Sequence, residues 1–164
     1  MPKLVIEIAF AVSLTFAAIV SFVTQAYAGD VMVGHAMARA STTPAAKTGA
    51  VYFMLMNHGT AADRLISVKT DAAARAELHE TAMENGIATM RKVDAIDIGP
   101  HAMISLKPSG QHVMLFGLKA PLKKGEHLTL TLTFETAGDI PVDVTVGDVA
   151  AGMDHSMPDE ASGN

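Results

Sequence analysis

The stretch 126–135, EHLTLTLTFE, decides the fold class because its side chains alternate strictly between apolar and polar. Three leucines and Phe134 occupy the apolar positions, and threonines lie between them. Successive side chains of a strand point to opposite faces, so this alternation is typical of a half-buried antiparallel strand. Residues 140–146, IPVDVTV, alternate in the same way, and Ala137-Gly138-Asp139 between the two stretches indicates a hairpin turn.

The rest of the chain up to about residue 146 has the pattern of further short strands. GAVYFMLMN (49–57) is almost continuously apolar, which indicates a central strand covered on both faces and places Met54 and Met56 in the core. We expect a single helical turn at 71–74, after which the chain returns to strand. The other expected strands are 31–38, 64–69, 75–80, 87–93, 101–106 and 111–116. About nine short antiparallel strands with turn residues between them predict an all-β chain folded as a β-sandwich.

The two ends of the chain differ from this domain in composition. Residues 1–28 combine Lys3, a long apolar run and the small-x-small pattern Ala26-Tyr27-Ala28, so we expect a cleaved signal peptide, with an uncleaved membrane anchor as the alternative. We expect the folded domain over 29–148 and a flexible tail over 149–164, which is rich in small and acidic residues. No second apolar run reaches roughly 18 residues, so we expect no membrane insertion after cleavage.

Charge and composition exclude several classes of function. The chain has 12 basic and 17 acidic residues, a net charge of −5, which argues against a nucleic-acid partner. It has no cysteine, so disulfides, thiolate metal sites and cysteine nucleophiles are excluded. The motifs of a nucleophile elbow, a zinc protease and a phosphate-binding loop are missing from the sequence, so we expect a binding protein and no enzyme. An enzyme with a dispersed Ser/His/Asp triad and a purely structural sandwich stay open as alternatives.

Histidine and methionine are frequent, with 7 and 11 residues, and they are often placed together. Residues i and i+2 of a strand point to the same face, so a His-x-Met pair can present an imidazole and a thioether to one ion. Thioethers suit Cu(I) and imidazoles suit copper, zinc, iron and nickel, so the combination favours copper over zinc. The four pairs are His35/Met37, His101/Met103, His112/Met114 and His155/Met157.

Ordinary structural roles are the alternative for each of these residues taken alone. Methionine on a strand is usually a core residue, so we expect Met32 and Met83 to pack in the interior. We expect His58, in a turn, and His127, on the polar face of its strand, to face solvent.

Several motifs together resemble the periplasmic copper chaperone family PCu(A)C, over residues 31–147. The motifs are HAMARAS (35–41), GAVYFMLMNHG (49–59), ADRLISV (62–68), ELHET (77–81), LKPSGQHVML (106–115) and LKAPLKKGEHLTLTLTFETAG (118–138). The resemblance implies a cupredoxin-like Greek-key β-sandwich. It also implies a copper motif of the form His-x10-Met-x21-His-x-Met, which His79, Met90, His112 and Met114 match throughout.

By this resemblance the four residues bind Cu(I), and their chemistry agrees, because two imidazoles and two thioethers form a neutral set that suits a soft monovalent ion. The resemblance further implies a periplasmic protein that delivers copper toward the dinuclear copper centre of cytochrome c oxidase. Its partners would be the oxidase subunit that carries this centre, a thioredoxin-like assembly protein, or both. The alternative is a periplasmic tolerance or storage protein that sequesters copper or passes it to an exporter.

The tail contains a further Met-x-His-x-Met sequence formed by Met153, His155 and Met157. Some members of the family have Met- and His-rich extensions, so the resemblance implies an accessory site for a second copper ion, Cu(I) or Cu(II). A tail with no part in copper binding is the alternative.

Overall fold

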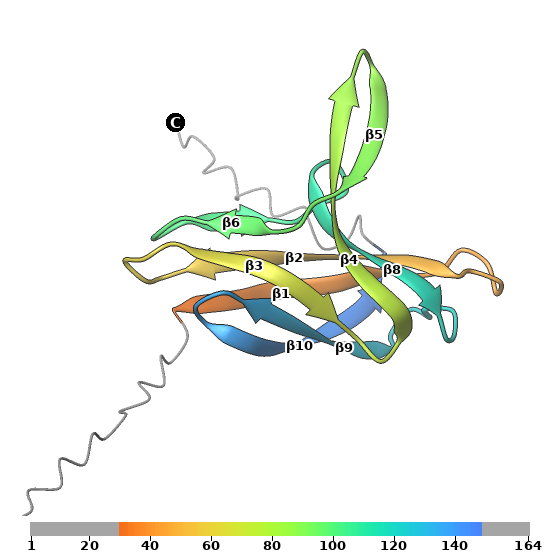
Figure 1. The fold of residues 1–164 in the computed structure, drawn as a ribbon. Coiled ribbons are helices and arrows are strands. Elements are labelled where there is room, and N and C mark those ends of the chain that lie inside the picture. The colour runs from red at the N-terminus through yellow and green to blue at the C-terminus, as the bar shows by residue number, and fades with distance from the viewer. Residues whose placement is uncertain (1–29, 149–164) are drawn as a thin grey trace, which may run out of the picture.

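The structure, a computed structural model, describes residues 30–148, and within this range the chain forms ten strands and no helix (Figure 1). No helix in this range is long and apolar enough to cross a membrane. The signal peptide expected over 1–28 and the tail expected over 149–164 lie outside the described residues. The strands are β1 (Val31–Arg39), β2 (Thr48–Asn57), β3 (Asp63–Lys69), β4 (Ala73–Glu84), β5 (Ile87–Lys92), β6 (Ile96–Ile98), β7 (Met103–Ser105), β8 (Gln111–Leu118), β9 (His127–Phe134) and β10 (Gly138–Gly147).

The strands form one hydrogen-bonded path, β5-β4-β8-β2-β1-β10-β9-β3-β6, with β7 attached to β2. The path closes over a shared apolar core, so the predicted all-β sandwich is confirmed. One part of the expectation is wrong, because β1 and β10 pair in parallel, with Met37 opposite Thr145. Parallel neighbours need a long connection, and here the whole domain lies between the first and the last strand.

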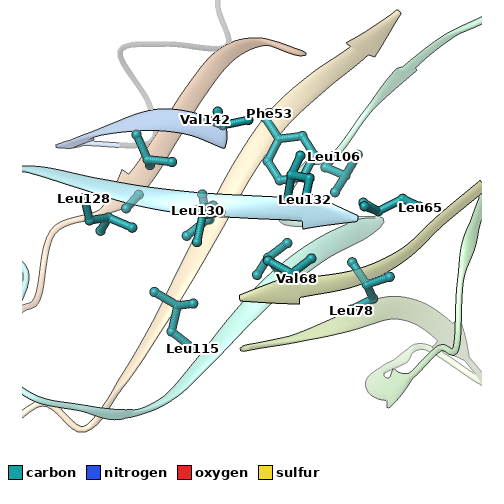
Figure 2. Packing of buried hydrophobic residues seen from close by; sticks show 14 of the residues in the cluster. Phe53, Leu65, Val68, Leu78, Leu106, Leu115, Leu128, Leu130, Leu132 and Val142 are labelled. Atoms are coloured by element: carbon teal, nitrogen blue, oxygen red, sulfur yellow. The ribbon is translucent and has the colours of Figure 1, made fainter. Parts of the chain in front are cut away.

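The hairpin of β9 and β10 forms as its alternating pattern predicts. Leu132 pairs with Ile140 and Leu130 pairs with Val142, and Gly138 has a φ of +75°, which suits glycine. Leu130 and Leu132 are fully buried. Figure 2 shows the leucines of β9 gathered with Phe53 of β2 and Leu115 of β8, so the apolar face of the hairpin covers the core.

Two local expectations differ from the structure, and one short strand was not predicted. Residues 71–74 form no helical turn: the chain bends at 71–72 and β4 begins at Ala73, because this segment pairs with β8. Sequence patterns missed β6, a three-residue strand held by β3, and the strand expected over 101–106 shortens to β7. Strands this short have too few residues to show a period, and only the partner strand defines them.

The outer face of β2 also differs from the expectation. Val51, Phe53 and Leu55 point into the core, and the residues between them point outward. Met54 and Met56 are therefore only half-buried, so their assignment to the core is wrong. Met32 and Met83 are 54% and 69% exposed, and the prediction that they pack inside is wrong too. An apolar stretch of sequence does not show which face of its strand is covered by the rest of the protein, so it cannot show that a methionine is exposed.

Candidate metal centre

The four residues of the His-x10-Met-x21-His-x-Met motif lie on three neighbouring strands, β5, β4 and β8. The register of β4 with β8 places His79 directly opposite His112. The centroids of the two imidazole rings are 6.3 Å apart. Directly opposed residues of an antiparallel pair share a face, so both rings lie on one side of the sheet. Leu78 and Val113, which alternate with them, are buried in the core, so this side is the outer one.

Both methionines lie on the same outer face, diagonally across from His79. Met114 pairs with Glu77, and Met90 pairs with Thr81, each two residues from His79 along β4. Diagonal neighbours lie about 7–8 Å apart at Cα, within reach of long side chains. The structure thus brings the four predicted residues to one face, with His79 in the middle strand. We call these four residues the His/Met cluster.

A tight hairpin carries Met90 into this position. Asn85 and Gly86 form the two-residue turn between β4 and β5, with φ values of 53° and 79°. Two residues of positive φ match the type I′ turn, whose twist suits an antiparallel pair and fixes its register. Figure 1 shows the hairpin standing away from the sandwich, and the Met90 side chain is 64% exposed. One donor of the His/Met cluster is therefore open to solvent.

His112 is held by the backbone of the loop before β8. The side chain is 3% exposed, and its Nδ1 lies 3.0 Å from the carbonyl oxygen of Gly110. A carbonyl can only accept, so Nδ1–H donates and Nε2 carries the free lone pair. The ring of Tyr52 lies 6.1 Å away and packs beside it.

His79 is oriented by a carboxylate on its own strand. Its Nε2 lies 3.1 Å from Oε2 of Glu77, and its ring lies 5.7 Å from the ring of Phe116. When Nε2–H donates to the carboxylate, Nδ1 carries the free lone pair. Metal-binding histidines usually donate their other ring N–H to a carboxylate or a backbone carbonyl, and both histidines of the cluster have such an acceptor.

Glu77 stands among positive groups that keep it ionised. The hydrogen bond from His79 lowers the pKa of the Glu77 carboxyl, burial opposes this, and the charges of Lys92 and Arg75 lower the pKa further. Nε of Arg75 is 3.0 Å from the carboxylate and Nζ of Lys92 is 3.9 Å away. The Arg75 guanidinium also lies 5.0 Å from the centre of the Phe116 ring. The lowered pKa favours the ionised carboxylate, which accepts the hydrogen bond from His79.

Sequence reasoning missed Glu77, Phe116 and Tyr52 as neighbours of the cluster. Glu77 and Phe116 occur at even spacing from the cluster residues of β4 and β8, so strand alternation could have found them. Tyr52 is on a third strand, and its place beside His112 depends on the pairing of β2 with β8. Burial raises the pKa of Tyr52, which the charge of Arg39 partly offsets.

The two other His-x-Met pairs within residues 30–148 lack this regular placement. His35 lies in an irregular part of β1, where the register shifts between Gly34 and Met37, and has a φ of 50°. His101 has a φ of 53° and precedes β7. The pair in the tail, with Met153, His155 and Met157, lies outside the described residues. His58 and His127 are exposed as predicted, and Nδ1 of His127 lies 2.9 Å from a carboxylate oxygen of Asp143.

Solved structures define the class to which this fold belongs. The copper-bound PCuAC domain from PmoF2 is 26% identical with a TM-score of 0.62, over 73% of this chain and 94% of that one. Cu(I)-loaded DR1885 from Deinococcus radiodurans is 31% identical with a TM-score of 0.56, over 71% of this chain and 78% of that one. The protein is an all-β domain of the PCuAC type, and the predicted cupredoxin-like fold is confirmed.

Residues 31–146 match the family described as "Putative lipoprotein LpqE-like", and the chain belongs to this family. The "Putative lipoprotein Lxx21020" of Leifsonia xyli subsp. xyli is 37% identical over 93 residues, 56% of this chain and 56% of that protein. An uncharacterized protein of Rickettsia prowazekii, RP573, is 30% identical over 87 residues, 52% of this chain and 48% of that protein. The chain thus spans about half the length of the curated relatives it matches.

Proposed function

We propose that this protein is an extracytoplasmic copper chaperone that holds Cu(I) through His79, Met90, His112 and Met114. The observation that carries the proposal is the shared outer face of β5, β4 and β8, on which both histidines already have hydrogen-bond acceptors behind them. The copper-bound PCuAC domain from PmoF2 and Cu(I)-loaded DR1885 support copper as the cargo.

The donor set explains why the cargo is monovalent copper. Two neutral imidazole nitrogens and two thioether sulfurs add no charge, so a monovalent ion leaves the smallest net charge at the surface. Cu(II) prefers tetragonal nitrogen and oxygen donors, whereas soft sulfur donors select Cu(I). The exposure of Met90 lets an acceptor replace that thioether first, so copper leaves in steps. Binding with stepwise release suits a carrier better than a catalyst.

We propose the periplasm as the place of action and the dinuclear copper centre of cytochrome c oxidase as the destination. The lipoprotein description of the family and of its relative in Leifsonia xyli supports an extracytoplasmic location. The destination, and a partner that is the oxidase subunit or a thioredoxin-like assembly protein, rest on the resemblance to PCu(A)C. A signal peptide over residues 1–28 belongs to the same proposal.

Anaerobic titration with Cu(I) against a competing chelator tests the His/Met cluster. The variants Met90→Leu and Met114→Leu keep the apolar volume and remove the sulfur, so each lowers the Cu(I) affinity at least tenfold. Met83→Leu is the matched control, because Met83 is similarly exposed on the same hairpin and is not in the motif. Unchanged affinity in both Met90→Leu and Met114→Leu would place the copper elsewhere.

Deletion of the gene tests the destination. A delivery role predicts low cytochrome c oxidase activity when copper is scarce, restored by added copper. Normal oxidase activity together with heightened sensitivity to copper would instead support tolerance or storage.

The tail enters the proposal as an accessory site formed by Met153, His155 and Met157. A chain that ends after Val149 should then bind less copper in total and keep the affinity of the His/Met cluster. An unchanged total would assign the tail no copper.

A further inference from the structure

A second group of methionines lies on the same outer face, on strands that the His/Met cluster does not use. The register of β1 with β2 pairs Met32 with Met56, and the register of β2 with β7 pairs Met56 with Met103. Directly opposed residues share a face, so the three side chains form a line across three adjacent strands. We call this line the methionine row.

The methionine row does not serve the core. Met32 is 54% exposed, Met103 is 64% exposed, and Met56 between them is half-buried. Their neighbours along the strands, Val31 and Leu55, point to the opposite face and fill the interior. Two of the three side chains are thus exposed at the surface and the third is half-buried between their strands, and the core does not account for methionine at these positions.

The spacing lets three sulfurs meet. Adjacent strands lie about 4.7–4.9 Å apart, so the backbones that carry Met32 and Met103 are about 10 Å apart with Met56 midway. A methionine sulfur is two bonds beyond Cβ, and the unbranched side chain adapts readily. The outer two side chains can therefore lean inward until all three sulfurs surround one point above β2.

Gly34 leaves space for this movement. The terminal methyl of Met56 lies 3.4 Å from the position that a Cβ on Gly34 would occupy, so Met56 already leans toward β1. A side chain at position 34 would narrow the space between Met56 and β1. Glycine at position 34 therefore leaves room for the Met56 side chain on the β1 side, the strand that also carries Met32.

We propose that Met32, Met56 and Met103 form a second Cu(I) site made of three thioethers. Soft thioether sulfur selects Cu(I) and not zinc, magnesium or calcium, which prefer other donors. The site is independent of the His/Met cluster: Tyr52 packs beside His112, and Met56 lies four residues further along β2, about 13 Å from Tyr52. With only three thioethers, two of them exposed, and no imidazole, it binds Cu(I) more weakly than the His/Met cluster.

The experiment follows each methionine methyl by NMR in the full chain labelled with [methyl-13C]methionine, during anaerobic titration with Cu(I). Single Met→Leu variants assign the signals. The first equivalent should shift the methyls of Met90 and Met114. Further Cu(I) should shift the three methyls of the methionine row together. If these three stay unmoved up to several equivalents while the tail methionines shift, the proposal is overturned.

A double variant, Met32→Leu with Met103→Leu, provides the second measurement. It should lower the affinity for the weaker equivalent at least tenfold and leave the first equivalent unchanged, and Met83→Leu should change neither. Because leucine keeps the volume and both positions are exposed, the fold is expected to persist, and circular dichroism checks this. An unchanged first equivalent in Met90→Leu and Met114→Leu would contradict the proposed function and not the row, so the two failures are distinguishable. An unaltered weaker equivalent in the double variant would overturn the proposal.

Discussion

One hydrogen-bond acceptor for each histidine determines which ring nitrogen of His79 and of His112 is protonated. The carboxylate of Glu77 accepts a hydrogen bond from Nε2 of His79, and the carbonyl of Gly110 accepts one from Nδ1 of His112. The two rings are thereby fixed in opposite tautomers, each with one nitrogen left for an ion. Glu77 lies two residues before His79, so both side chains are on the same face of β4. Many residue pairs in strands have this spacing, so only the hydrogen bond in the structure identifies Glu77 as the partner of His79.

The variant Glu77→Ala tests this orientation. Removal of the acceptor frees the His79 ring, and loss of such an outer partner typically costs 10–100-fold in metal affinity. We expect a weakening of Cu(I) binding in that range in a chelator competition. Glu77→Gln keeps a hydrogen-bond acceptor and should stay closer to the wild type. Equal, undiminished affinity in both variants would show that Glu77 has no part in binding.

Tyr52 gives a prediction for pH. Burial raises the pKa of its hydroxyl above the ordinary value of 10.0, so the folded chain keeps a proton that the unfolded chain releases. The resulting contribution to the free energy of unfolding is complete below pH 10.0 and is lost as the pH rises through the higher pKa of the folded state. Titration of phenolate absorbance should show the raised pKa, and in Tyr52→Phe the decline of stability above pH 10.0 should flatten. A pKa at or below the ordinary value would contradict the prediction.

At the scale of elements, the β4–β5 hairpin decides where Met90 lies. Its register depends on the two positive φ values of Asn85 and Gly86. β4 is longer than the predicted strand 75–80, because it continues to Glu84, where β5 pairs with it. Pairing with a partner extends a strand beyond what its own pattern indicates.

The variant Gly86→Val tests the hairpin. A β-branched residue at a φ of 79° is strained, so the turn should open, Met90 should lose its register, and Cu(I) affinity should fall several-fold. Gly125→Val is a matched control, since Gly125 also has a positive φ and open space around its Cβ position, away from the hairpin. Both variants should lose about 1–3 kcal/mol of stability. A similar loss of copper affinity in both would attribute the effect to the fold as a whole.

For the whole molecule, the core supports both methionine-bearing surfaces. The β9–β10 hairpin closes the sandwich beneath the outer face, with Leu130 fully buried. Leu130→Ala should lower the free energy of unfolding by about 2–5 kcal/mol, measured by urea denaturation. The exposed neighbour Thr129→Ala should change it by no more than about 0.5 kcal/mol. A loss below about 1 kcal/mol for Leu130→Ala would mean that the site is not packed as described.

The all-β fold class follows from the amino-acid sequence, because the strict alternation in 126–135 and 140–146 is a local property of strands. The spacing His-x10-Met-x21-His-x-Met is also present in the sequence, and through the resemblance to PCu(A)C it predicts His79, Met90, His112 and Met114 as copper ligands. Tertiary structure decided what lies beside them: the register of β4 with β8, the carboxylate behind His79, and the outer face on which Met32, Met56 and Met103 line up. These facts depend on pairing between strands far apart in the sequence, and no local pattern encodes the partner of a strand.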